Sequence, residues 1–252
     1  MALALLPVVS FGLVIGSFLN VVIARLPQRR SLWAPRSACP QCGNPIAWYD
    51  NIPLISFAAL RGRCRACAAP IPWRYPLVEA STAALFALAW IVFAGDVGNF
   101  VVSAVFLAAL VAITVIDLRH QIIPDAITLP GIVVGLATSL TMGRISWVDS
   151  LGGILLGGGL FVAIILVSRG GMGGGDLKLG AMLGAFLGWQ ALLVALFVAV
   201  MLGGICAVTL LVWGQVARKD AIPFGPFLAL GGVVALFWSH PIIAWYLGGF
   251  ER

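Results

Sequence analysis

Two pairs of cysteines are the clearest candidates for chemistry in this sequence. Cys39-Pro-Gln-Cys42 and Cys64-Arg-Ala-Cys67 are separated by 21 residues, close to the zinc-ribbon spacing of about 15–20. Each pair forms a tight turn that directs two thiolates toward one ion, and four thiolates are a common tetrahedral zinc set. A redox-active dithiol is the alternative interpretation. A zinc site is favoured if the segment lies in a reducing cytoplasm, where disulfides do not persist.

Carboxylates at the edges of apolar segments are the second set of candidates, because an ionisable group is costly there and needs a reason. The acids to be weighed are Glu79, Asp117, Asp125, Asp149 and Asp176. Asp149 and Asp125 occupy positions typical of helix caps. Asp117 ends an apolar run, and Asp176 closes a glycine-rich run whose backbone lets another chain come close.

Two carboxylates among Asp117, Asp125 and Asp176 have the chemistry of an aspartic peptidase pair. When two carboxylates converge, one holds a proton and polarises a carbonyl, while the other activates water as a general base. The simpler interpretation is that each Asp caps a helix or pairs with Arg119 or Lys178. Spacing alone leaves both interpretations open.

The composition indicates that these residues are positioned by membrane-spanning helices. The chain of 252 residues is 62% hydrophobic and 10% charged, whereas soluble domains are about 45–50% apolar and about 25% charged. Segments near the required length of about 20 residues are Leu3–Ala24, Leu77–Ala94, Phe100–Ile116, Ile122–Met142, Leu151–Val167, Ala191–Trp213 and Phe224–Leu247. A shorter stretch, Leu177–Trp189, is counted as an eighth span. The predicted fold is an all-α polytopic membrane protein.

Basic residues predict the orientation, because Lys and Arg are retained on the cytoplasmic side during insertion. With eight spans and an external N-terminus, thirteen of the fifteen basic residues are cytoplasmic, and only Arg144 and Arg252 are external. The cytoplasmic set is Arg25, Arg29, Arg30, Arg36, Arg61, Arg63, Arg65, Arg74, Arg119, Arg169, Lys178, Arg218 and Lys219. Without the eighth span, Arg218 and Lys219 would lie outside. Nucleic-acid binding is disfavoured, since no basic face with stacking aromatic residues is visible.

Three domains are expected from this organisation. Residues 1–24 form the first transmembrane helix, residues 25–75 form a zinc-ribbon-like cytoplasmic domain, and residues 76–252 form a transmembrane peptidase domain. Residues 25–75 contain few aliphatic side chains, so metal binding is expected to supply the missing folding free energy. Arg61, Arg63 and Arg65 are expected to help keep the thiols ionised.

Several segments in a fixed order resemble the type IV prepilin peptidases. These segments are Gly16-Ser-Phe-Leu-Asn, Trp48-Tyr-Asp-Asn-Ile-Pro between the cysteine pairs, Arg74-Tyr-Pro-Leu-Val-Glu79, Asp117 followed by Pro124-Asp125, Gly173-Gly-Gly-Asp176 and Ile222-Pro-Phe-Gly-Pro-Phe. The resemblance covers about residues 10–230. It implies a Gly-x-Gly-Asp intramembrane aspartic peptidase in which Asp117 and Asp176 are catalytic.

The resemblance also implies substrates, a methyl donor and a location. Family members cleave the basic leader of type IV prepilins or type II secretion pseudopilins after Gly, and many then N-methylate the new terminus with S-adenosylmethionine. The cysteine domain is associated with the methylating forms, and the location is the bacterial inner membrane with the site facing the cytoplasm. Glu79 is expected to pair with Arg74 or to contribute to methyl transfer.

Two other classes fit parts of the pattern. A zinc-sensing membrane transporter would use the cysteines for sensing, but it would place acids near the middle of its spans. A membrane thiol oxidoreductase would need its cysteines near a quinone or facing an oxidising compartment, which the charge distribution opposes. The position of the acids at the cytoplasmic edge therefore favours the peptidase.

Overall fold

The computed structural model describes residues 2–93, 96–142, 144–168, 173–215 and 222–248. Four of the basic residues used to predict the orientation, Arg169, Arg218, Lys219 and Arg252, lie outside the described residues, as do residues 170–172 of the glycine-rich run. Within the described part the chain is helical and contains no strand, apart from two isolated β-bridges. Two compact units are present, Met1–Ala112 and Ile113–Arg252.

The first unit consists of a helical pair and the segment between its two members. α1 (Ala2–Arg25) packs against α3 (Arg74–Val92). The glycines of α1 permit this contact, because a Cβ on Gly12 would lie 2.7 Å from the Ala83 Cα and one on Gly16 would lie 2.6 Å from the Glu79 Cα. Small residues of this kind let helix backbones approach closely in a membrane.

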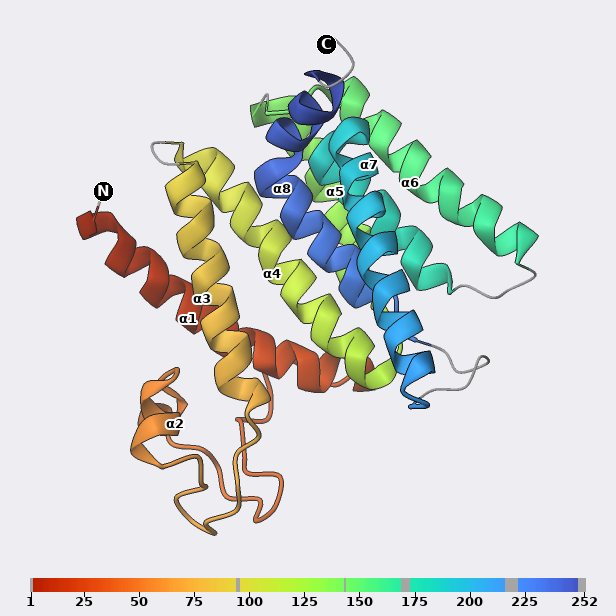
Figure 1. Cartoon of the computed structure of the whole chain (residues 1–252). Helices are drawn as coiled ribbons and strands as arrows, with labels where there is room; N and C mark the ends of the chain where they lie inside the picture. The colour runs from red at the N-terminus through yellow and green to blue at the C-terminus, as the bar shows by residue number, and fades with distance from the viewer. Residues whose placement is uncertain (1, 94–95, 143, 169–172, 216–221, 249–252) are drawn as a thin grey trace. The chain divides into compact units, whose positions relative to one another are not determined.

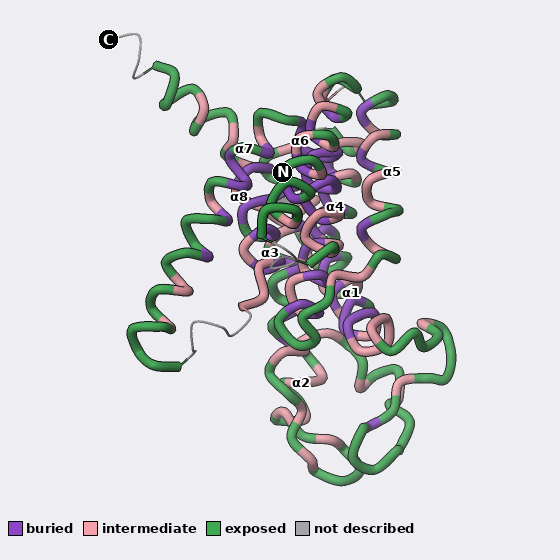
Figure 2. The backbone as a smooth tube through the Cα atoms, turned by 90° about the vertical axis from the view of Figure 1, so that its right-hand side faces the viewer, coloured by how far each residue is buried: buried purple, intermediate pink, exposed green. Residues whose placement is uncertain are grey.

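The segment between α1 and α3, residues 26–73, is here called the cysteine module. Its only regular elements are η1 (Leu26–Gln28), η2 (Trp48–Asn51) and α2 (Ile55–Ala59). Cys39 is its one buried residue, and the rest of the module is exposed or half-buried (Figure 2). A segment without an apolar core needs another source of folding free energy, and a metal ion held by the cluster of thiols described below would supply one.

α4 (Val97–His120) continues from the first unit into the second, where it is followed by α5 (Asp125–Met142), α6 (Trp147–Val167), α7 (Gly174–Val212) and α8 (Gly225–Gly248) (Figure 1). Within the second unit α7 packs against α5, α6 and α8. Its side chains supply much of the buried apolar surface, including Leu179, Met182 and Leu183. α7 is therefore the central helix of this unit.

The packing of α6 on α7 depends on glycines facing each other. A Cβ on Gly153 would collide with the backbone of Gly184, and a Cβ on Gly157 would collide with the backbone of Gly180. Ser150 adds a buried hydrogen bond from its hydroxyl to the Ala185 carbonyl, at 2.8 Å. Gly153 and Gly157 therefore allow the close packing of these two helices.

Seven helices of the described chain are long and apolar enough to cross a membrane, and α7 is counted among them once although it has 39 residues. A straight helix of that length would extend about 58 Å, nearly twice the hydrocarbon thickness of about 30 Å. Gly188 interrupts α7 with φ 76° and ψ 168°, a conformation that favours glycine. Figure 1 shows the chain turning back within α7. The break divides α7 into two helices, as the predicted eighth span requires, and the polytopic all-α fold is confirmed.

Side chains around Gly188 stabilise the turn. Trp189 donates from its ring Nε1 to Asp149 Oδ1 at 3.0 Å. Asp149 lies in the first turn of α6, whose N-cap is Ser146, and its amide donates to the Ser146 hydroxyl at 3.1 Å. Asp149 was predicted to be a helix cap, but the N-cap is Ser146, and Asp149 is the third residue of α6. Its carboxylate accepts from the Ser146 hydroxyl and, at the α7 break, from Trp189.

Candidate active site and metal centre

The two cysteine pairs lie on two loops of the same construction. Cys39 donates its amide to the Asn44 carbonyl and accepts from the Gly43 amide. In the second loop, Cys64 donates to the Ala69 carbonyl and accepts from the Ala68 amide. The isolated bridges Ala38–Pro45 and Arg63–Pro70 occupy matching places. These contacts of the first loop recur in the second, so the module contains an internal structural repeat.

The four thiols converge at one point. The Sγ atoms of Cys39, Cys42, Cys64 and Cys67 all lie within 4.8 Å of one another, and those of Cys39 and Cys67 are 3.8 Å apart. In a tetrahedral thiolate site with zinc–sulfur distances of about 2.3 Å, neighbouring sulfurs are about 3.8 Å apart. The cluster thus has the size and donor set to hold a metal ion, as the spacing predicted.

The thiols differ in acidity. Amide hydrogen bonds from Cys42 and Gln41 lower the pKa of Cys39 to about 6. For Cys67, the Ala69 amide acts to lower the pKa, but desolvation and the neighbouring thiols outweigh it and raise the pKa to about 12. Four thiols at this separation cannot all ionise without a cation, and a divalent metal displaces their protons.

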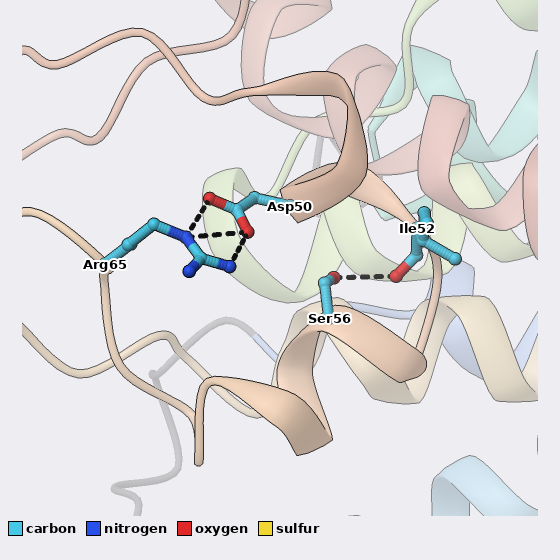
Figure 3. Close-up of polar contacts among 4 residues, drawn as sticks. All are labelled: Asp50, Ile52, Ser56 and Arg65. Carbon is cyan, nitrogen blue, oxygen red and sulfur yellow. Dashed lines mark hydrogen bonds and ion pairs between the residues drawn. The ribbon is translucent and has the colours of Figure 1, made fainter.

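An ion pair connects the second cysteine loop to η2. Arg65 donates from Nε and Nη2 to the carboxylate of Asp50, with Nη2 2.6 Å from Oδ1 (Figure 3). Its guanidinium also lies 5.4 Å from the ring centroid of Tyr49. Its hydrogen bonds lower the pKa of Asp50. Ser56 donates to the Ile52 carbonyl nearby, at the start of α2. Arg65 was expected to stabilise the thiolates, but its partner is Asp50, and its contribution is to fix the loop.

Asp117 lies in the last turn of α4 with 5% of its surface exposed. Its Oδ2 accepts a hydrogen bond from the Gly225 amide at 3.0 Å. Gly225 is the first residue of α8, whose free amides favour a carboxylate. Asp117 thus holds the start of α8 through one of its two carboxylate oxygens.

Asp176 lies in the first turn of α7 and is half-buried. The helix begins at Gly174, so Gly174 and Gly175 belong to it, although the sequence suggested a glycine loop up to Asp176. The close approach that glycine permits is found at Gly175, where a Cβ would lie 2.9 Å from the Ile123 Cβ. Ile123 precedes α5 in the chain and fills the space beside α7.

Ile123 also brings the two carboxylates into one place. Its Cδ1 would lie 3.2 Å from a Cβ on Gly225, the residue that donates to Asp117, while its Cβ abuts Gly175 beside Asp176. The carboxylates of Asp117 and Asp176 interact electrostatically. The two residues are about sixty positions apart in the sequence, and the structure brings the segments that carry them together around one residue, Ile123.

A second ion pair lies next to this site. Lys178 Nζ contacts both carboxylate oxygens of Asp125, at 2.6 and 2.7 Å. Asp125 is the first residue of α5, and Lys178 follows Asp176 by two residues in α7. Lys178 was considered a partner for one of the catalytic candidates. Its partner is Asp125, which leaves Asp117 and Asp176 without an ion pair to a base within the described residues.

Glu79 belongs to the first unit and does not pair with Arg74 in the described structure. Its Oε2 accepts from the Leu54 amide at 2.9 Å, and its carboxylate also interacts with the Ser17 hydroxyl. Arg74 instead donates to the Tyr75 hydroxyl at 3.0 Å and lies over the Tyr75 ring. The predicted Arg74–Glu79 pair is wrong: Arg74 Nη2 donates to its neighbour Tyr75, and Arg74 Nη1 is buried without a hydrogen-bond partner among the described residues.

A hollow of about 570 Å³ lies on the cysteine module. Its wall includes two aromatic rings, Phe57 and Trp73, whose centroids are 4.9 Å apart, and two basic side chains, Arg61 and Arg63. Small-molecule sites have volumes of about 300–1,000 Å³. Nothing in the sequence pattern indicated this hollow, because its walls come from both sides of the second cysteine loop.

The elements and the site define a multi-pass membrane protein with a four-cysteine module and two converging carboxylates. The Bacterial Peptidase A24 N-terminal domain matches residues 9–93, and the Type IV leader peptidase family matches residues 104–208. The chain therefore belongs to the type IV leader peptidase family, and it is an enzyme of the peptidase class. No solved structure matches it.

Curated relatives called prepilin leader peptidase/N-methyltransferase support this assignment. The one from Aeromonas hydrophila is 41% identical over 270 residues, covering 95% of this chain and 92% of the relative. The one from Burkholderia pseudomallei (strain 1026b) is 39% identical, with coverages of 96% and 87%. The one from Myxococcus xanthus is 45% identical over a shorter region, 79% of this chain and 61% of the relative.

Proposed function

We propose that the protein is an aspartic endopeptidase whose catalytic residues are Asp117 and Asp176. The observation that carries the proposal is the convergence of these two carboxylates beside Ile123, from the end of α4 and the start of α7. Two carboxyl groups in one site share a proton, so that one polarises the scissile carbonyl and the other activates water. Neither has a basic side chain among its described contacts that would keep both ionised.

The substrates we propose are prepilins, and by extension type II secretion pseudopilins. The relatives carry the first of these substrates in their names. A precursor with a basic leader and a hydrophobic helix would present its scissile bond at the membrane surface. The charge distribution predicts that this surface is the cytoplasmic face of a bacterial inner membrane. Cleavage after Gly fits this site, because Ile123 and Asp117 fill the space beside Gly175 and Gly225 and leave little room for a substrate side chain.

The cysteine module is proposed to bind structural zinc through Cys39, Cys42, Cys64 and Cys67. The 3.8 Å sulfur separation and the four-thiol donor set support zinc over the harder cations. The bound ion would connect the two loops and thereby replace an apolar core. The module would then hold its hollow in a defined shape.

Methyl transfer to the new N-terminus is the second proposed activity, and the relatives' names support it. S-adenosylmethionine supplies an electrophilic methyl group when bound. The hollow suits such a ligand, because Phe57 and Trp73 offer ring faces to an adenine and a sulfonium. Arg61 and Arg63 offer hydrogen bonds to its carboxylate.

Replacement of either catalytic carboxylate tests the proposed peptidase. Asp117→Asn and Asp176→Asn should each reduce leader removal from a prepilin in detergent to background, while the protein stays in the membrane. Asp96→Asn is the matched control, since Asp96 precedes the other end of α4 and accepts from the Asn99 amide. Wild-type processing by either the Asp117 or the Asp176 variant would refute the assignment.

A further inference from the structure

Glu79 is a buried carboxylate that the peptidase mechanism does not use. It lies in the second turn of α3 with 8% of its surface exposed, inside a helix long and apolar enough to cross a membrane. Its described contacts are the Leu54 amide and the Ser17 hydroxyl, both of them neutral. An ionisable residue in such a helix is expensive and by default indicates a function.

The carboxylate has no counter-ion among the residues that the structure describes. Of the ion pairs recorded within the described residues, one joins Arg65 to Asp50 and the other joins Lys178 to Asp125. Arg74, the base nearest to Glu79 along α3, is bonded to Tyr75. A buried carboxylate with hydrogen bonds but no cation is incompletely compensated, so a cationic ligand would complete the site.

A structural role alone does not require a carboxylate at this position. The contact to Leu54 uses one oxygen as a hydrogen-bond acceptor, which an amide oxygen provides equally well. A glutamine would satisfy the Leu54 amide without the cost of a charge. The carboxylate therefore points to a role that needs a negative charge or a proton acceptor.

We propose that Glu79 binds the α-ammonium group of the cleaved substrate and accepts its proton before N-methylation. The proposal rests on the proposed methyl transfer. An α-amino group has a pKa of about 7.7–8.0 and is mostly protonated at neutral pH, which leaves no lone pair for attack. When the proton passes to Glu79, the freed lone pair forms the N–C bond to the donor's methyl group. The S–C bond breaks, and its electron pair stays on sulfur, so the sulfonium becomes a neutral thioether and the product is a methylammonium.

The position of Glu79 agrees with this role. Leu54, which Glu79 holds by its amide, immediately precedes α2, and Phe57 of α2 lines the hollow proposed for the donor. One turn of helix, about 5.4 Å, separates these two residues along α2. Trp73, on the same hollow, immediately precedes α3. Glu79 and the hollow are thus connected through both α2 and the start of α3.

Binding of a short peptide measures the first half of the proposal without any turnover. The peptide carries the mature pilin N-terminus, either free or acetylated, and is titrated into the zinc-loaded, full-length protein in detergent by calorimetry. The wild type should prefer the free amine by about tenfold or more, as expected for a charge-assisted contact. Glu79→Gln, which keeps an acceptor for Leu54, should bind both peptides equally. Ser81→Ala is the control, because the Ser81 hydroxyl donates to the Val78 carbonyl of the same helix and its removal keeps the Glu79 carboxylate and its contacts.

Methyl incorporation and leader removal are then measured on the same preparations. Glu79→Gln should lose methyl transfer by about 100-fold or more and retain leader removal, zinc content and thermal stability. Retained amine preference and methylation in Glu79→Gln would overturn the proposal, and so would an equal affinity of the wild type for the two peptides. Failure of the wild type to methylate would instead count against the proposed second activity. The preference for the amine, measured by binding alone, would still decide whether Glu79 holds the ammonium.

Discussion

Asp117 and Gly225 lie so close together that one added methyl group would act on the catalytic geometry. A Cβ on Gly225 would lie 2.6 Å from Asp117 Oδ2 and 3.1 Å from its Cγ. The carboxylate is the flexible end of a side chain and can turn away, so the fold is expected to tolerate the substitution. The carboxylate itself would leave its position.

Gly225→Ala should therefore lower the rate of leader removal by about 100-fold, the size of effect expected from a displacement of about 1 Å. Thermal unfolding of the variant should change little. Gly204→Ala is the control, because no atom lies within 4 Å of a Cβ built there. Undiminished activity in Gly225→Ala would show that the position of Asp117 Oδ2 is unimportant.

Some site residues could be predicted from the sequence and others could not, for a physical reason. The four cysteines and the two aspartates are visible because their types and short-range spacing carry the chemistry. The roles of Gly225 and Ile123 could not be predicted, since they come from contacts with partners remote in sequence, 108 residues for Gly225 and Asp117. The error at Arg74 was of another kind: the sequence offered Glu79 as a plausible partner, and the observed partner is the adjacent Tyr75.

At the scale of elements, α6 and α7 approach too closely for any side chain at the facing glycines. A Cβ on Gly157 would meet the Gly180 carbonyl, which belongs to a helix backbone and cannot turn away. Gly157→Ala should lower stability by about 1–3 kcal/mol, the usual cost of overpacking. Thermal unfolding in detergent, followed by circular dichroism, measures this.

Gly159→Ala is the matched control for that prediction. It lies on the same helix, and no atom lies within 4 Å of its built Cβ. Alanine favours a helix over glycine, so the control should be as stable as the wild type or slightly more so. Equal losses in both variants would show that the facing glycines have no special part in the contact.

The ion pair between Asp125 and Lys178 joins the first turns of α5 and α7 next to Asp176. Either charge reversal alone, Asp125→Lys or Lys178→Asp, should lower leader removal by about tenfold, because like charges then face each other. The double variant should recover most of the loss. Recovery in the double variant would show that the two residues act through their contact with each other. An inactive double variant would contradict this role and show that each residue is required separately.

Helices were easier to predict than the places where they begin, end or break. Long apolar runs gave every spanning helix, because burial in lipid requires them. The break in α7 was placed near Gln190, whereas it occurs at Gly188, whose positive φ depends on contacts with α6. The sequence also failed to predict that α7 begins before Asp176, because glycines disfavour a helix by propensity. In the structure, Gly175 allows the close contact with Ile123.

At the scale of the whole molecule, the break at Gly188 decides on which side of the membrane the last segments lie. With two passes in α7, residues 213–215 should lie on the same side as the cysteine module, and the C-terminus should lie on the opposite side. A single pass would exchange the two positions. The distribution of Lys and Arg predicts that the module's side is the cytoplasm.

Epitope tags inserted after Gln215 and added at the C-terminus test this topology. In spheroplasts of intact inner membrane, the C-terminal tag should bind antibody directly. The tag after Gln215 should bind only after permeabilisation, as should a tag inserted after Arg30 in the module. The opposite pattern for the first two tags would mean that α7 crosses once.

The internal repeat of the cysteine module has a consequence for biosynthesis. The first loop, with Cys39 and Cys42, leaves the ribosome well before its counterpart with Cys64 and Cys67, so a nascent chain that ends between them offers an ion only half its ligands. The second loop is completed just before α3 emerges. Capture of the ion would draw together the two chain ends that lead into α1 and α3, which pack through Gly12 and Gly16. Metal supply during translation is therefore expected to limit how efficiently the newly made α3 pairs with α1 in the bilayer.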